Sequence, residues 1–373
     1  MRRSFEGIPI VGDIDCRVAA ARGLLSGAGG GALVALNVAN VRYLSGFEDV
    51  WDAEPFSLLL VTEHEAIVFT DSRYSESAER ASSDSPWEVV CATDDLWSDA
   101  LARAAQSGAT CVVVESSAPY AVVEQARGKF AGEIVPTGGW VEGLRAVKDE
   151  AEIDRIVAAQ AITDEAFDHV LGFIAVGMTE VDVALELEFF MRSHGSDGIA
   201  FPPIVASGPN SALPHAHAGK RVVAYGDYLK MDFGARVGGY CSDMTRTVVI
   251  GKASARQREI YETVLAANLA GIAAVRPGLP SRDIDAAARA VIEAAGFGEC
   301  FGHGLGHGVG LEVHELPSVG ARSEEPVPLG SVVTIEPGVY VPGFGGVRIE
   351  DLVVVEEAGA RVLTRSTKEL IEL

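Results

Sequence analysis

The chain has 373 residues, of which 48% are hydrophobic, and carries a formal charge of -23 at pH 7. Its length predicts two domains, and its hydrophobic content is enough for large buried cores. Nucleic acids are bound mainly by clustered Lys and Arg, so the acidic balance and the lack of a basic run disfavour a nucleic-acid partner.

The N-terminal residues show no targeting pattern. Arg2 and Arg3 are not followed by an apolar segment, because Glu6, Pro9 and Asp13 interrupt it. We therefore expect no signal peptide, no transmembrane span, no membrane partner and a cytoplasmic location. The five cysteines are widely scattered and include no Cys-x-x-Cys pair, so we interpret them as reduced thiols.

The first 143 residues alternate strand-like and helix-like patterns. Apolar runs over residues 32–37 and 56–70 predict a strand and a hairpin. Two helical patterns then alternate with two strand-like runs, at residues 95–105, 111–115, 120–130 and 133–135. This alternation predicts an α/β domain.

A stretch rich in glycine and polar residues, 136–143, predicts the boundary between an N-terminal domain over 1–143 and a C-terminal domain over 144–373. An amphipathic helical pattern follows, through about residue 173. The C-terminal domain then repeats one order of elements, helix, turn, helix and strands, which predicts two related halves. The strands of each half carry two acidic residues: Asp232 and Asp243 in the first, Glu336 and Glu350 in the second.

The first acidic pair is placed by a predicted hairpin. Gly238-Gly239 lies between two strand-like runs and is typical of a two-residue turn with positive φ. With that turn Asp232 faces Thr245, and Asp243 lies one diagonal step away on the same face, about 7–8 Å distant along the backbone. Taken alone, the pair fits a shared cation site and two exposed aspartates equally well.

The second acidic pair lies in strands that we predict to be buried, because their sequences are apolar. Glu336 follows an apolar run, and Glu350 is embedded in another, so each needs a counter-charge. Arg348, on the same strand face as Glu350, can neutralise one acid, with surface pairing as the alternative. Two divalent cations would balance four carboxylates, and one added histidine would complete an oxygen-rich site.

A glycine-rich segment, 302–315, holds three of the eight histidines: His303, His307 and His314. Five glycines between positions 302 and 310 make a regular helix improbable, so we expect an irregular loop or strand. Alternate glycines let the backbone approach an ion or a ligand, and imidazoles supply metal ligands and proton carriers. The alternative is a surface turn with incidental histidines. A zinc protease of the His-Glu-x-x-His type is excluded, because Ser318 stands where the second histidine is needed.

Five motifs follow one another in the C-terminal domain: Met231-Asp232-Phe233-Gly234, Ser242-Asp243-Met244-Thr245-Arg246-Thr247, the histidine segment, Thr334-Ile335-Glu336-Pro337-Gly338 and Arg348-Ile349-Glu350-Asp351. Together with Asn40-Val41-Arg42-Tyr43-Leu44-Ser45-Gly46-Phe47 and Thr70-Asp71-Ser72-Arg73-Tyr74, they resemble the proline-specific metallopeptidases of the pita-bread fold, the aminopeptidase P and prolidase family. The resemblance implies an α/β N-terminal domain of the creatinase/prolidase type. It also implies an α+β pita-bread catalytic domain with pseudo-twofold halves.

The resemblance also implies site residues, cofactors and partners. It implies two divalent metal ions, Mn²⁺ in preference to Co²⁺ or Zn²⁺, with five ligands: Asp232, Asp243, His307, Glu336 and Glu350. The catalytic residues that we expect beside them are His215, His303, His314, Glu336 and Arg348. The implied substrates are peptides with proline in the second position, and the implied assembly is a homodimer.

The resemblance leaves several activities to compare. We expect an Xaa-Pro aminopeptidase, with an Xaa-Pro dipeptidase (prolidase) as the alternative and a non-catalytic binding protein of the same fold ranked lower. A dipeptidase needs a cation for the free carboxylate that follows proline, and some prolidases carry an arginine where this chain has Ser318. Arg322 lies near enough in sequence to keep the alternative open. Methionine aminopeptidase lacks the large N-terminal domain, and creatinase lacks the metal ligands.

Overall fold

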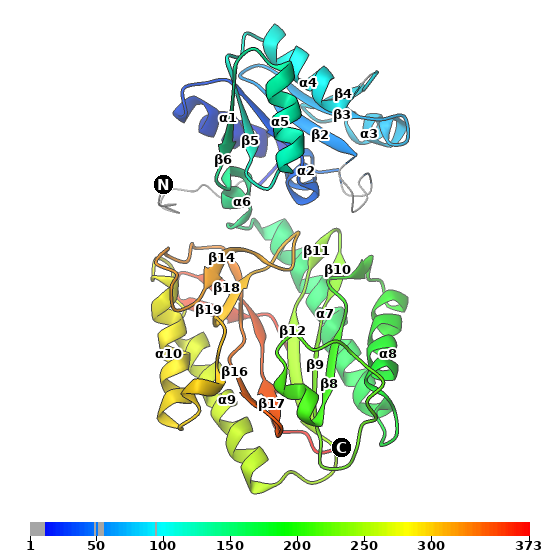
Figure 1. Ribbon diagram of the computed structural model, residues 1–373, viewed down its shortest axis with the longest axis vertical. Coiled ribbons are helices and arrows are strands. Elements are labelled where there is room, and N and C mark those ends of the chain that lie inside the picture. Colours follow the sequence, from blue (N-terminus) through cyan, green and yellow to red (C-terminus); the bar gives the residue numbers. More distant parts are fainter. Residues whose placement is uncertain (1–11, 48–49, 51–55, 94) are drawn as a thin grey trace. The chain divides into compact units, whose positions relative to one another are not determined.

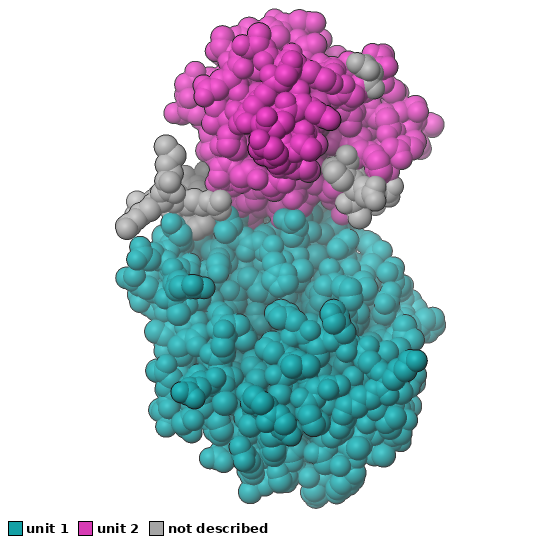
Figure 2. Space-filling model, viewed as in Figure 1, with its two compact units in different colours: residues 1–7, 146–373 teal, residues 8–145 magenta. Residues whose placement is uncertain are grey.

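The computed structural model describes residues 12–47, 50, 56–93 and 95–373. They form two compact units, and the division falls between Arg145 and Ala146 (Figures 1 and 2). Among the described residues, no helix is long and apolar enough to cross a membrane.

The N-terminal unit is built on one mixed six-stranded sheet in the order β4-β3-β2-β1-β5-β6. Its strands are β1 (Ala32–Ala35), β2 (Ser57–Val61), β3 (Ala66–Thr70), β4 (Glu88–Cys91), β5 (Cys111–Glu115) and β6 (Glu133–Thr137). Its helices are α1 (Ile14–Gly27), α2 (Val38–Ser45), α3 (Ser75–Ala81), α4 (Leu96–Gln106), α5 (Tyr120–Lys129) and α6 (Trp140–Arg145). Apolar residues of α4 and α5 pack on the sheet as one core. The predicted α/β organisation and the β2–β3 hairpin are confirmed.

A buried amide ties this unit together. Asn40 on α2 is fully buried, and its Nδ2 donates to Glu115 Oε1 at 2.7 Å and to Glu142 Oε1 at 3.0 Å. Its Oδ1 accepts from Arg145 Nη1 at 2.8 Å. Asn40 thus satisfies groups from the end of β5 and from α6, so the first motif of the N-terminal unit has a structural role.

The C-terminal unit consists of two halves with the predicted repeat of elements (Figure 1). The first half contains α7 (Glu150–Phe173), α8 (Glu180–Ser193), β7 (Gly198–Ile199), β8 (Ile204–Ser207), η1 (Gly208–Ala212), β9 (Tyr228–Phe233), β10 (Ala235–Val237), β11 (Tyr240–Cys241) and β12 (Met244–Val249). The second contains α9 (Ala255–Ala274), α10 (Ser281–Ala294), η2 (Gly298–Cys300), β13 (Gly306–Gly308), β14 (Glu315–Val319), β15 (Val332–Ile335), β16 (Gly338–Val341), β17 (Gly345–Arg348), β18 (Asp351–Glu356) and β19 (Gly359–Val362). In each half the helix pair covers the strands and closes one apolar core. This is the expected α+β arrangement with two related halves.

The predicted hairpin is confirmed. Gly238 and Gly239 form its two-residue turn with φ of 55° and 82°, a region that residues with a Cβ rarely adopt. Asp232 pairs with Thr245 across β9 and β12. Because cross-strand partners share a face and side chains alternate, Asp243 lies on the face of Asp232.

The glycine-rich segment forms β13 and connecting loop, as expected, but its glycines serve a different purpose. A Cβ at Gly306 would lie 2.0 Å from the carbonyl oxygen of Thr334, and a Cβ at Gly308 would lie 2.2 Å from that of Leu316. The close approach that these glycines permit is therefore to neighbouring backbone on β15 and β14. The expected approach to an ion is not what these two positions require.

This packing predicts unequal costs for two alanine substitutions. Gly306→Ala should lower the free energy of unfolding by about 1–3 kcal/mol, because backbone atoms must shift to admit the methyl group. Gly302→Ala is the matched control: nothing lies within 4 Å of its Cβ position and its φ is not positive. It should change stability by no more than about 0.5 kcal/mol. Urea unfolding of both variants measures the difference, and equal stabilities would contradict the packing argument.

Candidate active site

The four acidic residues predicted to meet lie where long strands pass from one sheet to another. Asp232 is near the end of β9, Asp243 lies between β11 and β12, Glu336 between β15 and β16, and Glu350 between β17 and β18. Asp243, Glu336 and Glu350 therefore lie outside the regular strand pairing. The amide of Glu350 donates to Thr245 O at 3.1 Å, in the other half of the unit. The expectation of an unbroken strand around Glu350 was therefore wrong, because a cross-half hydrogen bond replaces the ladder.

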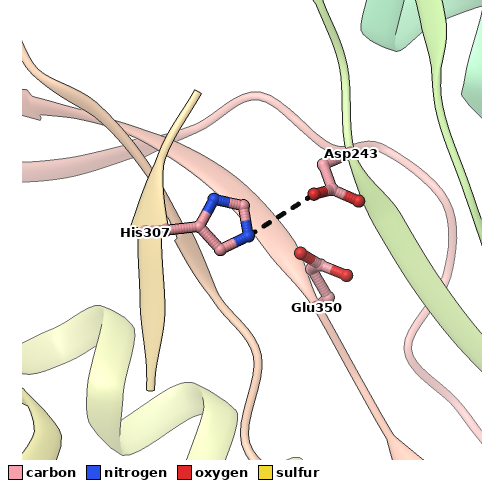
Figure 3. Close-up of side chains that lie close together, drawn as sticks. All are labelled: Asp243, His307 and Glu350. Carbon is pink, nitrogen blue, oxygen red and sulfur yellow. Dashed lines mark ion pairs between the residues drawn. The ribbon is translucent and has the colours of Figure 1, made fainter. Parts of the chain in front are cut away.

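Three of the predicted metal ligands converge most closely. Asp243, His307 and Glu350 each offer a ligand atom, and these atoms lie within 4.8 Å of one another (Figure 3). His307 Nε2 lies 3.6 Å from Asp243 Oδ2 and 3.3 Å from Glu336 Oε1. Four residues from four sequence motifs thus share one small volume.

Arg348 supplies the counter-charge on the opposite side of the acids. Its Nη2 forms an ion pair with Asp232 Oδ2, and its Nε lies 3.8 Å from Glu336 Oε2. The Nε also donates to Thr245 Oγ1 at 2.8 Å. The guanidinium is buried and serves two acids from other strands. From its position two residues before Glu350, we expected Arg348 to neutralise only one acid.

Burial sets the protonation of the cluster. It raises the pKa of Asp243 well above its ordinary value and, with the charges of Glu336 and Asp232, raises the pKa of Glu350 to about 8. Burial alone would also raise the pKa of Glu336, but the hydrogen bond and charge of His307 lower it to about 2. Burial would lower the pKa of His307, and Glu336 instead raises it to about 9.

Two carboxylate oxygens in the cluster lack a protein partner. Asp232 Oδ1 and Asp243 Oδ1 are buried and accept no hydrogen bond from any described residue. A buried carboxylate oxygen without a donor is costly, and divalent cations are the partners that such oxygens take. These donors therefore fit the two divalent metal ions that the sequence resemblance implied.

The three other predicted histidines differ in how free their rings are. Both ring nitrogens of His303 are engaged, Nδ1 at 2.7 Å from Gly304 O and Nε2 at 2.9 Å from the hydroxyl of Tyr340. The ring of His314 lies against that of His307 in a tilted arrangement, with 4.3 Å between ring centroids and 49° between ring planes. Within the described part of the chain, the nitrogens of His314 and His215 have no hydrogen-bond partner, and both residues are exposed. They are the imidazoles available to a bound molecule.

Two ion pairs, one of them fully buried, hold the ends of the glycine-rich segment. Arg289 pairs with Asp285 at 2.7 Å and donates to His303 O at 2.8 Å. Lys148 pairs with Glu315 at 2.6 Å, and the two side chains are 1% and 3% exposed. Neither pair was predicted. Arg289 and Asp285 lie four residues apart on α10 and reach the segment only in the folded chain, and Lys148 and Glu315 are far apart in sequence.

Two further unpredicted residues border the acids. The hydroxyl of Tyr340 accepts from Arg348 Nη1 at 3.0 Å and contacts His303. Lys230 is fully buried on β9, where burial lowers its pKa to about 6. A lysine inside the apolar run 228–233 was the only sequence signal for it.

Comparison with known proteins agrees with this geometry. Residues 154–357 match metallopeptidase family M24, and residues 17–147 match the creatinase/prolidase N-terminal domain. An Xaa-Pro dipeptidase of Pyrococcus horikoshii is 37% identical over 335 residues, which cover 89% of this chain and 92% of that protein. The structure of an Xaa-Pro dipeptidase from Bacillus anthracis has 38% identity and a TM-score of 0.92, covering 97% and 100% of the two chains. An X-Pro aminopeptidase from Thermotoga maritima has 34% identity and a TM-score of 0.83, covering 96% and 100%. The chain therefore belongs to metallopeptidase family M24 and has the pita-bread fold expected of the aminopeptidase P and prolidase family.

Proposed function

We propose that the protein is a dinuclear metal-dependent Xaa-Pro peptidase whose primary activity is that of a dipeptidase. The observation that carries the proposal is the buried cluster of Asp243, His307 and Glu350, with orphaned carboxylate oxygens beside it, in a chain of family M24. The names of the similar proteins from Pyrococcus horikoshii and Bacillus anthracis favour the dipeptidase. A cytoplasmic location and a homodimer remain predictions.

The proposed metal ligands are the five predicted from the sequence: Asp232, Asp243, His307, Glu336 and Glu350. A set of four carboxylates and one imidazole is oxygen-rich and favours Mn²⁺ over softer ions, with Co²⁺ and Zn²⁺ as alternatives. When bound, the two cations supply Lewis acidity that acidifies water and polarises the scissile carbonyl.

The protein's own groups handle the protons. A prolyl nitrogen carries no hydrogen and must take up a proton as it leaves. We assign Glu336 to hold that proton, because its carboxylate belongs to the cluster and accepts a hydrogen bond from the hydroxyl of Thr334 at 3.2 Å. The free imidazoles of His215 and His314 stabilise the developing oxyanion or pass on the proton. His303, bonded through both nitrogens, orients Tyr340.

An Xaa-Pro aminopeptidase is the second candidate. Ser318 pairs directly with His307 across β14 and β13, so it occupies the strand position next to a proposed metal ligand. No guanidinium stands there to bind a free carboxylate after proline. This observation, together with the Thermotoga maritima structure, favours longer peptides. From the sequence alone, the serine at position 318 and the resemblance of Thr70-Asp71-Ser72-Arg73-Tyr74 to the family were the reasons for placing the aminopeptidase first.

Comparison of Ala-Pro with Ala-Pro-Ala distinguishes the two candidates. A dipeptidase should cleave Ala-Pro with a kcat/KM at least about 100-fold higher, because the longer peptide lacks a carboxylate at the proline. Release of alanine is measured for both peptides with Mn²⁺-loaded enzyme. Chelator-treated enzyme and the peptide Ala-Ala serve as controls and should show no turnover. Faster cleavage of Ala-Pro-Ala would establish the aminopeptidase, and cleavage of neither would refute the proposed function.

Metal binding at pH 7 should release protons. In the metal-free protein Glu350 and His307 have pKa values of about 8 and 9, so both are protonated at pH 7. Metal coordination requires the deprotonated forms, so we expect more than one proton per site to be released and affinity to rise between pH 7 and pH 9. Titration calorimetry in buffers of different ionisation enthalpy measures the protons. Glu350→Gln should release fewer, and a binding heat independent of the buffer would be the contrary result.

Two histidine variants separate metal binding from catalysis. His307→Ala should lower the metal content, since His307 is a proposed ligand. His314→Ala should keep its metal and lose kcat by roughly 10²–10⁴-fold, the usual scale for removal of a proton-transfer or oxyanion group. The control is His194→Ala, an exposed histidine at the end of α8, which should keep both. Loss of metal in His314→Ala, or a normal kcat, would show that its assigned role is wrong.

A further inference from the structure

Lys230 is a fully buried lysine whose side-chain nitrogen faces a loop rather than an acid. It lies two residues before Asp232 on β9 and therefore on the same strand face. Its Nζ donates to Leu213 O at 2.7 Å and to Pro214 O at 3.2 Å. The same Nζ also lies over the ring of Tyr340, 5.1 Å from the ring centroid.

The two acceptors immediately precede His215. The imidazole of His215 is exposed and has no hydrogen-bond partner among the described residues. No hydrogen bond from a described residue fixes the ring, so the backbone before it has to set its position. A second donor, Arg348 Nη1, reaches Pro214 O at 3.3 Å.

The flanks of this loop are also anchored. Glu180, fully buried at the start of α8, accepts from Ser207 N at 2.7 Å on one side of the loop and from Gly219 N at 3.1 Å on the other. Between these two anchors, the side chains of Lys230 and Arg348 donate hydrogen bonds to the loop carbonyls of Leu213 and Pro214. The loop that presents His215 is thus fixed at both ends and in the middle.

A lysine at this buried position needs a reason. The alternate residues Leu229, Met231 and Phe233 of β9 pack in an apolar core with the helices. On the opposite face, beside Asp232, an unbranched apolar residue would fill the place of Lys230 without the cost of burying a polar amine. What lysine adds is hydrogen bonding to Leu213 and Pro214. We propose that Lys230 is a positioning residue that fixes these two carbonyls and thereby the imidazole of His215 above the acidic cluster. The catalytic part of this inference rests on the proposed function.

A double-mutant cycle tests whether Lys230 acts through His215. Lys230→Met, close to lysine in shape but without the donor, should lower kcat on Ala-Pro by about 10- to 100-fold, the scale of a misplaced catalytic group, with the metal content unchanged. In a His215→Ala background the same change should alter kcat by less than about twofold, because the group that it positions is absent. Equal losses in both backgrounds would overturn the proposal.

A second readout does not depend on activity. In protein labelled with ¹³C-histidine, the Cε1–Hε1 signal of His215 is identified by its loss in His215→Ala. Lys230→Met should broaden or shift that signal and leave the signal of His169, on α7, unchanged. An unchanged His215 signal would refute the positioning role, whereas a wild-type enzyme that cleaves no Xaa-Pro peptide would refute only the proposed function.

Folding of the variant is checked by thermal unfolding. Lys230→Leu repeats the measurements if Lys230→Met does not fold. Failure of both variants to fold would also overturn the proposal, because Lys230 would then hold the domain together rather than one loop.

Discussion

The burial of four carboxylates between two related halves is the constraint on which the C-terminal unit depends. Like charges at this distance in a medium of low polarity repel strongly, and the structure offers Arg348 and the protonated His307 as counter-charges. The strands bend at the acids, and backbone groups there are satisfied from the other half, as the bond from Glu350 to Thr245 shows. The same arrangement therefore interrupts regular strand pairing at the acids and brings their carboxylates together as a candidate cation site.

The histidines are held by a different principle from the acids. The acids stand on strands or directly between them, whereas His215, His303 and His314 stand on loops. Loops give freedom to reach a substrate but need separate anchors. The anchors are charged groups: the partly buried Arg289 at the start of the glycine-rich segment and the buried Lys148 at its end. Removing either partner of such a pair leaves an uncompensated charge, so each is expected to be coupled to stability as well as to geometry.

What the sequence could and could not predict follows the range of the interactions involved. Gly238-Gly239 fixed the register of its hairpin because turn chemistry is local, and Asp232 and Asp243 were placed correctly. The break at Glu350 escaped prediction because its hydrogen-bond partner, Thr245, lies in the other half of the unit. Gly306 was expected to admit an ion, but its actual neighbour is the backbone of Thr334, which only the folded sheet reveals. The sequence pattern therefore predicted the motifs, but contacts between residues far apart in sequence determine which groups each motif touches.

Charge balance links the metal site to the reaction. Asp232 gives Oδ2 to Arg348 and keeps Oδ1 without a partner, so one carboxylate can serve the guanidinium and a cation together. Four carboxylates with two divalent cations would be neutral, and the buried Arg348 adds one positive charge in a largely buried site. Attack on a carbonyl builds up negative charge, which a net positive site of low polarity stabilises more than water does. A neutral residue in place of Arg348 would still leave room for two cations but would remove the excess positive charge. Arg348 is thus better understood as part of the electrostatics of the transition state than as a structural counter-ion alone.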